Sequence, residues 1–265
     1  MRVLALESAS RLCSVALMID GRVEWRLAAD DARNSEVLLP LARALLAEAD
    51  VALSSLDGIA FGAGPGAFTG LRVACGVAQG LAFGADLPVV GVGSLDLIAE
   101  SVRSAVVPTA EVPDLAAPVA GAATGATAAA DAGAAPLRVL SALDARMGEV
   151  YWATLEAAGP DWRTLAGPAL CRPEAVPVPT GQGWLGAGEA FVLFREVLEA
   201  QLTGHCVWVA SADLLPRADR LARLGQHRLA HGQGMAPEHA HPIYVRDKVA
   251  QTEQERRTAA TPKSA

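Results

Sequence analysis

Two stretches of the chain, Val3-Leu-Ala-Leu-Glu7 and Val139-Leu-Ser-Ala-Leu-Asp144, share one pattern, an apolar run that ends in an acidic residue. In each case a polar turn and another apolar run follow. Short apolar runs between turn residues are typical of strands. The predicted strands are 3–7, 13–19 and 22–27 in the first half and 139–144 and 149–155 in the second. This repetition indicates an internal duplication that gives two related lobes.

The first half continues with segments that alternate between helix and strand. Leucines at helical spacing predict a helix over 36–49, capped by Asn34 or Ser35. A short buried strand is predicted at 56–62 and another at 88–92, and between them Thr69 is predicted to cap a helix that runs to about residue 84. Hairpin strands followed by alternating helices and strands predict an α/β fold with mixed sheets.

The segment 108–136 separates the two halves. It consists mostly of Ala, Gly, Thr and Pro and has no aromatic residue, so it can bury little apolar surface to offset the entropy of ordering. We therefore expect a linker or insertion there. The expected organisation is a first lobe at 1–107, this linker at 108–136, a second lobe at 137–248 and a polar tail at 249–265.

Composition and charge limit the classes of function that are possible for this chain. The 265 residues are 52% hydrophobic and 19% charged with a net charge of −7, which is typical of a globular protein and unlike a stand-alone nucleic-acid binder with a basic face. Four scattered cysteines form no CxxC pair, which favours reduced thiols in the cytoplasm. Neither a signal peptide nor a transmembrane segment is evident, so a cytoplasmic location and no membrane contact are expected.

Glu7 and Asp144 are the candidates for chemistry in a cleft between the lobes. In two-lobed actin-like ATPases such turn carboxylates hold a metal and the turns bind phosphate. The turns here, Ser8-Ala-Ser10 and Ala145-Arg-Met147, lack the glycine that lets a backbone approach phosphate closely. A phosphotransferase and a pair of fold-defining turns therefore both remain open.

Glycine-rich and histidine motifs are ambiguous in the same way. The loop Gly62-Ala-Gly-Pro-Gly66 before the Thr69 helix would suit an anion, although tight packing explains it equally well. Its members Gly64, Gly66 and Thr69, with Ser8, complete the set of cleft candidates. The GxGxxG match at 181–186 follows two prolines instead of a strand. His227 and His231 lie one helical turn apart but lack an acidic partner, which favours a solvated basic helix face over a metal site.

The second predicted helix is unusually apolar. Between Gly70 and Ala85 only Arg72 and Gln79 are polar, and Gly76, Gly80 and Gly84 recur every four residues. A helix that is apolar nearly all round must be covered on both sides. Its own sheet can cover one side, and the other side requires the preceding helix and a partner.

The motifs resemble those of the bacterial TsaB family of tRNA threonylcarbamoyladenosine biosynthesis proteins, once described as glycoprotease-like. The resemblance covers most of the chain outside the linker. It rests on Leu4–Ser10 with Cys13–Leu17, Asn34–Pro40, Gly64–Arg72 with Ala78–Ala82, Asp144–Tyr151 and Pro242–Lys248. The run Gly-Pro-Gly-Ala-Phe-Thr-Gly-Leu-Arg at 64–72 is the most specific part.

The resemblance implies a duplicated actin-like (ribonuclease H-like) two-lobe fold and a non-catalytic partner of the related enzyme TsaD, with the ATPase TsaE joining the complex and tRNA reached through it. Where TsaD has two metal-binding histidines, this chain has Ser94 and Ile98, and isoleucine cannot bind a metal. No catalytic residue, metal or cofactor is therefore expected. The family commonly has Asp in place of Glu7 and a shorter connection at 108–136.

Three functions follow for comparison. The first is a scaffold that dimerises with a TsaD-like paralogue, or with itself when alone, through the two helices of the first lobe. The expected interface residues are Leu38, Leu41, Leu45, Leu71, Gly76 and Gly80. The second function is an actin-like, nucleotide-dependent small-molecule kinase that uses Glu7 and Asp144. The third is a peptidase, for which the sequence lacks a GxSxG motif and any histidine before His205.

Overall fold

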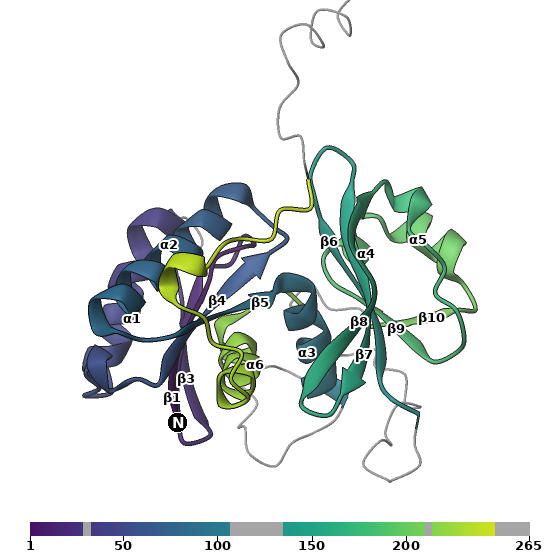
Figure 1. The fold of residues 1–265 in the computed structure, drawn as a ribbon. Helices are drawn as coiled ribbons and strands as arrows, with labels where there is room; N and C mark the ends of the chain where they lie inside the picture. Colours follow the sequence, from purple (N-terminus) through teal and green to yellow (C-terminus); the bar gives the residue numbers. More distant parts are fainter. Residues whose placement is uncertain (29–32, 107–134, 210–213, 247–265) are drawn as a thin grey trace, which may run out of the picture.

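The computed structural model describes residues 1–28, 33–106, 135–209 and 214–246. The expected linker at 108–136, apart from its last two residues, and the tail at 249–265 lie outside the described residues. Two five-stranded mixed sheets form two lobes (Figure 1). The α/β class with mixed sheets is thereby confirmed. Within the described ranges, no helix combines the length and apolar character needed to cross a membrane.

The first sheet has the strand order β3-β2-β1-β4-β5. Its strands are β1 (Arg2–Glu7), β2 (Ser14–Ile19), β3 (Arg22–Leu27), β4 (Gly58–Gly64) and β5 (Val89–Gly93). The first three pair antiparallel, and β4 and β5 add parallel to β1. The helices α1 (Asn34–Glu48) and α2 (Phe68–Ala85) cover the outer face of this sheet (Figure 1). A short 3-10 turn, η1 (Leu53–Ser55), precedes β4.

The second sheet repeats this topology with the order β8-β7-β6-β9-β10 when it is written in the same direction. Its strands are β6 (Arg138–Asp144), β7 (Val150–Ala158), β8 (Asp161–Cys171), β9 (Trp184–Ala187) and β10 (Cys206–Trp208). The outer helices are short, α4 (Ala190–Leu193) and α5 (Arg195–Leu202), and a 3-10 turn, η2 (Pro173–Ala175), lies before them. The expected strands at 139–144 and 149–155 are confirmed, whereas β8 to β10 were not predicted.

The predicted helix caps were wrong. Helix α1 starts at Asn34 after Arg33, and α2 starts at Phe68 after Ala67, and neither preceding residue caps through its side chain. The amide of Asn34 instead donates to the backbone oxygen of Ser8 at 3.3 Å. Thr69 therefore lies inside the first turn of α2, with its side chain exposed. A tertiary contact has replaced the local capping contact at the start of α1.

Each lobe contributes a helix to the other lobe. Helix α3 (Ser94–Val106) leaves the first sheet and packs against β6, β7, β8 and β9. Helix α6 (Ala218–Ala230) comes from the end of the chain and packs against β1, β2, β4 and β5. The 3-10 turn η3 (Pro237–His239) follows it and packs against α2. Segments distant in sequence therefore share each lobe, and the boundaries at 1–107 and 137–248 stay a prediction about the chain's organisation.

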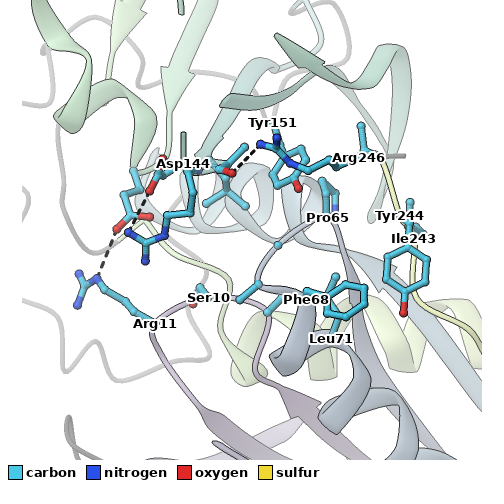
Figure 2. Close-up of a pocket in the computed structure, with 18 of the residues that line it drawn as sticks. Ser10, Arg11, Pro65, Phe68, Leu71, Asp144, Tyr151, Ile243, Tyr244 and Arg246 are labelled. Carbon is cyan, nitrogen blue, oxygen red and sulfur yellow. Dashed lines mark hydrogen bonds and ion pairs between the residues drawn. The ribbon is translucent and has the colours of Figure 1, made fainter. Parts of the chain in front are cut away.

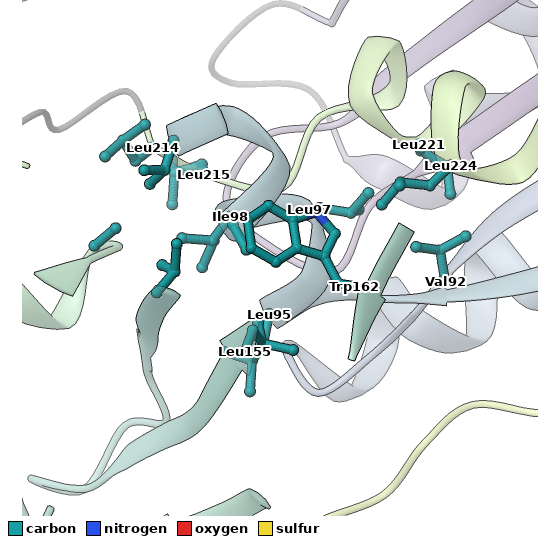
Figure 3. Packing of buried hydrophobic residues seen from close by; sticks show 14 of the residues in the cluster. Val92, Leu95, Leu97, Ile98, Leu155, Trp162, Leu214, Leu215, Leu221 and Leu224 are labelled. Atoms are coloured by element: carbon teal, nitrogen blue, oxygen red, sulfur yellow. The ribbon is translucent and has the colours of Figure 1, made fainter. Parts of the chain in front are cut away.

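A continuous apolar core fills the space between the two sheets. Leu97 and Ile98 of α3, Leu155 of β7 and Leu221 of α6 are fully buried in this core (Figure 3). Trp162 packs beside them, and its indole N–H donates to the carboxylate of Glu100 at 3.0 Å. The burial of these large side chains in one core joins the lobes through the hydrophobic effect.

Arg228 of α6 lies between two carboxylates from different elements. It contacts Asp96 of α3 and Asp161 of β8, each at 2.8 Å. All three side chains are less than one-fifth exposed. Burial raises the pKa of Asp96 although Arg228 opposes this. Burial also acts to raise the pKa of Asp161, but the hydrogen bonds and charge of Arg228, together with the backbone N–H of Trp162, lower it overall. The ion cluster therefore connects α6, α3 and the second sheet.

These contacts correct the expected solvated basic face on α6. Arg217 and Arg220, like Arg228, are largely buried and pair with carboxylates. The rings of His227 and His231 stack with their centroids 4.1 Å apart. No group of three or more metal-binding side chains occurs in the part of the chain that the structure describes.

Glu7, at the end of β1, is fully buried. Its Oε1 accepts the backbone N–H of Ala9 at 2.5 Å, and its Oε2 has no hydrogen-bond partner among the described residues. A Cβ atom on Gly62 would lie 1.9 Å from Oε2, so only glycine leaves room for this carboxyl group. Burial raises the pKa of Glu7 from 4.5 to about 7, although the backbone N–H groups of Ala9 and Ser8 oppose this.

We predict that Arg228→Ala lowers the free energy of unfolding by about 3 kcal/mol, because it leaves two largely buried carboxylates without a counter-ion. Chemical denaturation at neutral pH measures the change. Arg195→Ala is the control, since the Arg195–Glu199 pair is solvent-exposed and should contribute less than about 1 kcal/mol. Equal effects of the two substitutions would contradict a structural role for the buried cluster.

We predict that Glu7→Gln increases stability above pH 7. A carboxyl group whose pKa is higher in the folded state binds more protons there, so its contribution to stability falls as the pH rises from 4.5 to about 7. Glutamine mimics the protonated form and should raise the free energy of unfolding at pH 8 by about 2–3 kcal/mol. Denaturation at pH 5 and pH 8 tests this, with the exposed Glu24→Gln as control. An unchanged pH dependence in Glu7→Gln would refute the prediction.

Candidate functional site

A cleft of about 330 Å³ lies between the lobes (Figure 2). The first lobe contributes the turn at 9–11 and the loop at 65–68. The second lobe contributes the β6–β7 turn at 143–147, and residues 243–246 near the end of the described chain pass along one side. Apolar side chains, including Leu71 and Ile243, form much of its wall. The duplicated turns therefore meet at one cleft.

The charged groups of the cleft neutralise one another. Three arginines each contact a carboxylate of the chain, in the pairs Arg11–Glu189 at 3.6 Å, Arg146–Asp144 at 3.3 Å and Arg246–Glu149 at 2.6 Å. Asp144 also accepts the backbone N–H of Arg146 at 2.9 Å. A nucleotide would have to compete with these carboxylates for the arginines. The cleft therefore has little positive charge left to bind a polyphosphate.

Of the six predicted cleft residues, only Gly66 and Asp144 line the cleft. Glu7 and Ser8 are both fully buried behind it, and the Ser8 hydroxyl donates to the backbone oxygen of Gly70 at 2.7 Å. Gly64 and Thr69 also lie outside the lining. Ser8 lies behind the cleft because the first turn packs against the start of α2.

Close packing also explains the glycines of the loop before α2. A Cβ atom on Gly66 would approach the backbone oxygen of Ala9 to 2.3 Å, and one on Gly70 would approach that of Ser8 to 1.8 Å. The N–H of Ala67 donates to the Ala9 oxygen at 2.7 Å. The loop therefore binds the first turn of its own chain at the place where an anion was considered. Farther along, Gly186 of the GxGxxG match lies inside β9, so that motif does not form a strand-to-helix phosphate loop.

Within the described residues, the helices α1 and α2 carry an apolar face that no other element covers. We define the docking face as Leu41 of α1 with Val73, Gly76, Val77 and Gly80 of α2. Leu41, Val73 and Val77 are partly buried against the core below, and the two glycines are exposed. A Cβ atom on Gly76 or Gly80 would meet no neighbouring atom of the described residues within 4 Å. Space for a second protein is thus available directly above the α2 backbone.

Three of the predicted interface leucines do not belong to this face. Leu38 and Leu45 are fully buried, and Leu71 is 2% exposed. The stripe of α1 that carries Leu38 and Leu45 packs onto the first sheet, together with Ala42. These leucines stabilise the lobe and offer no surface to a partner in this structure. Leu41, Gly76 and Gly80 remain as candidates.

Sequence reasoning missed a cluster at the start of α2. Phe68, Arg72 and Tyr244, which we call the Arg72 cluster, lie at the edge shared by the cleft and α2 (Figure 2 labels the two aromatic residues). The Arg72 Nε donates to the Tyr244 hydroxyl at 3.0 Å. Phe68 and Arg72 are one helical turn apart, a spacing that could have suggested a contact. Tyr244 is 172 residues from Arg72, so only the folded chain shows the complete cluster.

Ser94 and Ile98, the two positions that the sequence resemblance aligns with metal-binding histidines, are buried in α3. Ile98 is fully buried in the core between the lobes, and Ser94 is also fully buried. The Ser94 hydroxyl has no hydrogen-bond partner among the described residues. Ile98 therefore serves packing at this position.

Comparison with known proteins agrees with these features. The family model described as "TsaD: tRNA N6-adenosine threonylcarbamoyltransferase" matches residues 29–254. The tRNA threonylcarbamoyladenosine biosynthesis protein TsaB of Escherichia coli is 33% identical over 94% of this chain and 96% of its own length. TsaB of Haemophilus influenzae is 30% identical over 93% of this chain and 94% of its own length.

A solved structure supports the same assignment. YeaZ from Pseudomonas aeruginosa superimposes with a TM-score of 0.72 at 35% identity, and the match covers 92% of this chain and 99% of that one. The resemblance inferred from the sequence motifs is confirmed by these matches. The chain therefore belongs to the TsaD family and, within it, to the group of tRNA threonylcarbamoyladenosine biosynthesis proteins named TsaB.

Proposed function

We propose that this chain is a non-catalytic subunit of a tRNA threonylcarbamoyladenosine-forming complex and that it binds a TsaD-like paralogue through its docking face. In this role it supports transfer of threonylcarbamoyl to the adenosine beside the tRNA anticodon. A TsaE-like ATPase joins the complex, and tRNA contacts it chiefly through the partner. The observation that carries the proposal is the uncovered apolar face over α1 and α2 in a chain similar to TsaB proteins.

The chemistry of α2 supports docking of a protein. The helix carries a single charged residue, Arg72, across its 18 positions, and Phe83 near its end is 78% exposed. An exposed apolar helix face is typical of a binding surface in an otherwise globular protein. Glycines at Gly76 and Gly80 let a partner helix approach the backbone closely. Contact with helices of a related fold would bury this face.

The composition of the cleft supports a non-catalytic role. Its arginines pair with carboxylates of the chain, and Glu7, the proposed kinase carboxylate, is buried behind it. The kinase alternative would need Glu7 and Asp144 to hold one metal, and Asp144 alone lines the cleft. Scaffolding through the docking face is therefore the better-supported function. A homodimer through the same face is an open alternative when the paralogue is absent.

We predict that Gly76→Arg abolishes association with the TsaD-like paralogue and leaves the subunit folded. The new side chain has free space in the isolated chain, but in a complex it would place a cation in an apolar contact without a counter-ion. Binding is measured by calorimetric titration and folding by the melting temperature.

Ala200→Arg provides the matched control, because it adds the same side chain at an exposed helical position of the second lobe. It should bind at full strength. A folded Gly76→Arg protein that binds as tightly as the control would contradict the proposed docking face.

Reconstitution tests the activity itself. We predict that threonylcarbamoyl transfer to tRNA by purified components requires this chain and that Gly76→Arg lowers the rate in proportion to its loss of binding. The product is measured as threonylcarbamoyladenosine in the recovered tRNA. Transfer at an undiminished rate without this chain would refute the proposed function.

A further inference from the structure

We propose that the Arg72 cluster is the charged anchor of the docking face and that Arg72 binds a carboxylate side chain of the docked partner protein. The inference rests on the proposed function, because it assumes that a protein covers this face. It adds a specific residue and a specific chemistry to a contact that is otherwise apolar.

Arg72 is held in one orientation by the two aromatic residues. Its guanidinium carbon lies 3.7 Å from the centroid of the Phe68 ring, and its Nε donates to the Tyr244 hydroxyl at 3.0 Å. The backbone next to Tyr244 is anchored to the first sheet, since the N–H of the preceding Ile243 donates to the backbone oxygen of Ala63 in β4 at 2.7 Å. An arginine with its plane stacked and its Nε engaged loses less conformational entropy when it forms another contact.

Among the described residues, the two terminal nitrogens of Arg72 have no side-chain or backbone acceptor. Within the ranges that the structure describes, no carboxylate pairs with Arg72, and the Tyr244 hydroxyl is the acceptor of its side-chain hydrogen bond. Each of the three cleft arginines, by contrast, contacts a carboxylate. Two parallel N–H groups match the oxygens of a carboxylate in a bidentate contact.

Arg72 shares the open face of α2 with the docking glycines. Gly76 and Gly80 follow it at intervals of four residues, which places all three on one side of a helix, and each is exposed. A protein that covers the glycines would therefore also reach Arg72. Phe68 and Tyr244, which are 39% and 46% exposed, would then exclude water from the ion pair and strengthen it.

The charge distribution favours a carboxylate on a different protein. The acidic residues of α1, Glu36 and Glu48, already pair with Arg33 and Arg26 at 3.0 and 2.8 Å, and α2 has no acidic residue. A second copy would therefore present no unpaired carboxylate from its own two helices. An RNA phosphate is disfavoured because RNA binding usually recruits several cations, and Arg72 is the single cation on an otherwise apolar helix of a chain with a net charge of −7.

Binding to the TsaD-like paralogue tests the anchor directly. We expect Arg72→Gln to weaken the affinity at least tenfold and Arg72→Glu to weaken it at least a hundredfold. Arg72→Lys should fall between the native protein and Arg72→Gln, because lysine keeps the charge and lacks the planar fork. Tyr244→Phe removes only the hydroxyl that accepts the hydrogen bond from Nε, and it should weaken the affinity for the paralogue a few-fold. Melting temperatures of these exposed-site variants should match that of the native protein.

Ionic strength provides an independent readout. Affinity of the native protein should fall more steeply between 50 and 500 mM NaCl than affinity of Arg72→Gln, because salt screens a rim ion pair. Arg43→Gln, at an exposed arginine of α1, is the matched control and should behave like the native protein. Equal affinity and equal salt dependence of native and Arg72→Gln proteins would overturn the anchor.

Other outcomes identify other occupants. Arg72→Glu could leave paralogue binding intact and instead abolish self-association in sedimentation analysis, or instead weaken binding of tRNA to the isolated chain. Either result would show that the carboxylate assignment is wrong. If Gly76→Arg blocked the paralogue and Arg72→Glu did not, the anchor would fail and the proposed function would stand. If the native chain did not bind the paralogue at all, the proposed function itself would fail.

Discussion

The core between the two sheets, and the ion cluster of Arg228 at its edge, hold the two lobes together. Helix α3 from the first half and helix α6 from the second half each pack on the sheet of the opposite lobe. Arg228 joins Asp96 of α3 to Asp161 of β8 where these elements meet. In the part of the chain that the structure describes, neither sheet has both of its faces covered by its own half of the chain. Folding of each lobe therefore depends on the other, because each supplies apolar surface that the other needs.

This arrangement sets the geometry of the cleft. The core brings the β1–β2 turn and the β6–β7 turn to opposite sides of one hollow, as the duplication requires. The groups that could have bound phosphate are already in contact with other parts of the chain. Gly66 and Gly70 pack against the backbone of the first turn, and the cleft arginines pair with carboxylates. The fold thus keeps its two lobes, while the arginines of the cleft pair with carboxylates of the same chain. Among the described residues, the apolar docking face lies elsewhere, on the outer face of the first lobe.

That outer face combines two kinds of residue with different physical consequences. Leu38 and Leu45 of α1 pack onto the sheet and are fully buried. The glycines of α2 leave the backbone open, which favours close approach by a partner helix. The Arg72 cluster adds an oriented charge at one end of this face. An apolar surface provides binding energy and a fixed charge provides selectivity among partners, so the same helix can supply both.

The sequence alone determined the duplicated strand pattern, the α/β class and the apolar character of α2, because side-chain periodicity and turn residues act over a few neighbouring positions. The motif at 64–72 also indicated the family. It could not determine which leucines face inward, since the leucines of α1 are alike in type and only the sheet beneath selects the stripe with Leu38 and Leu45. Nor could it place α6 on the first sheet, bury Glu7 behind the cleft or bring Tyr244 to Arg72. These features depend on contacts between segments far apart in the chain, and only the tertiary structure decides which of them form.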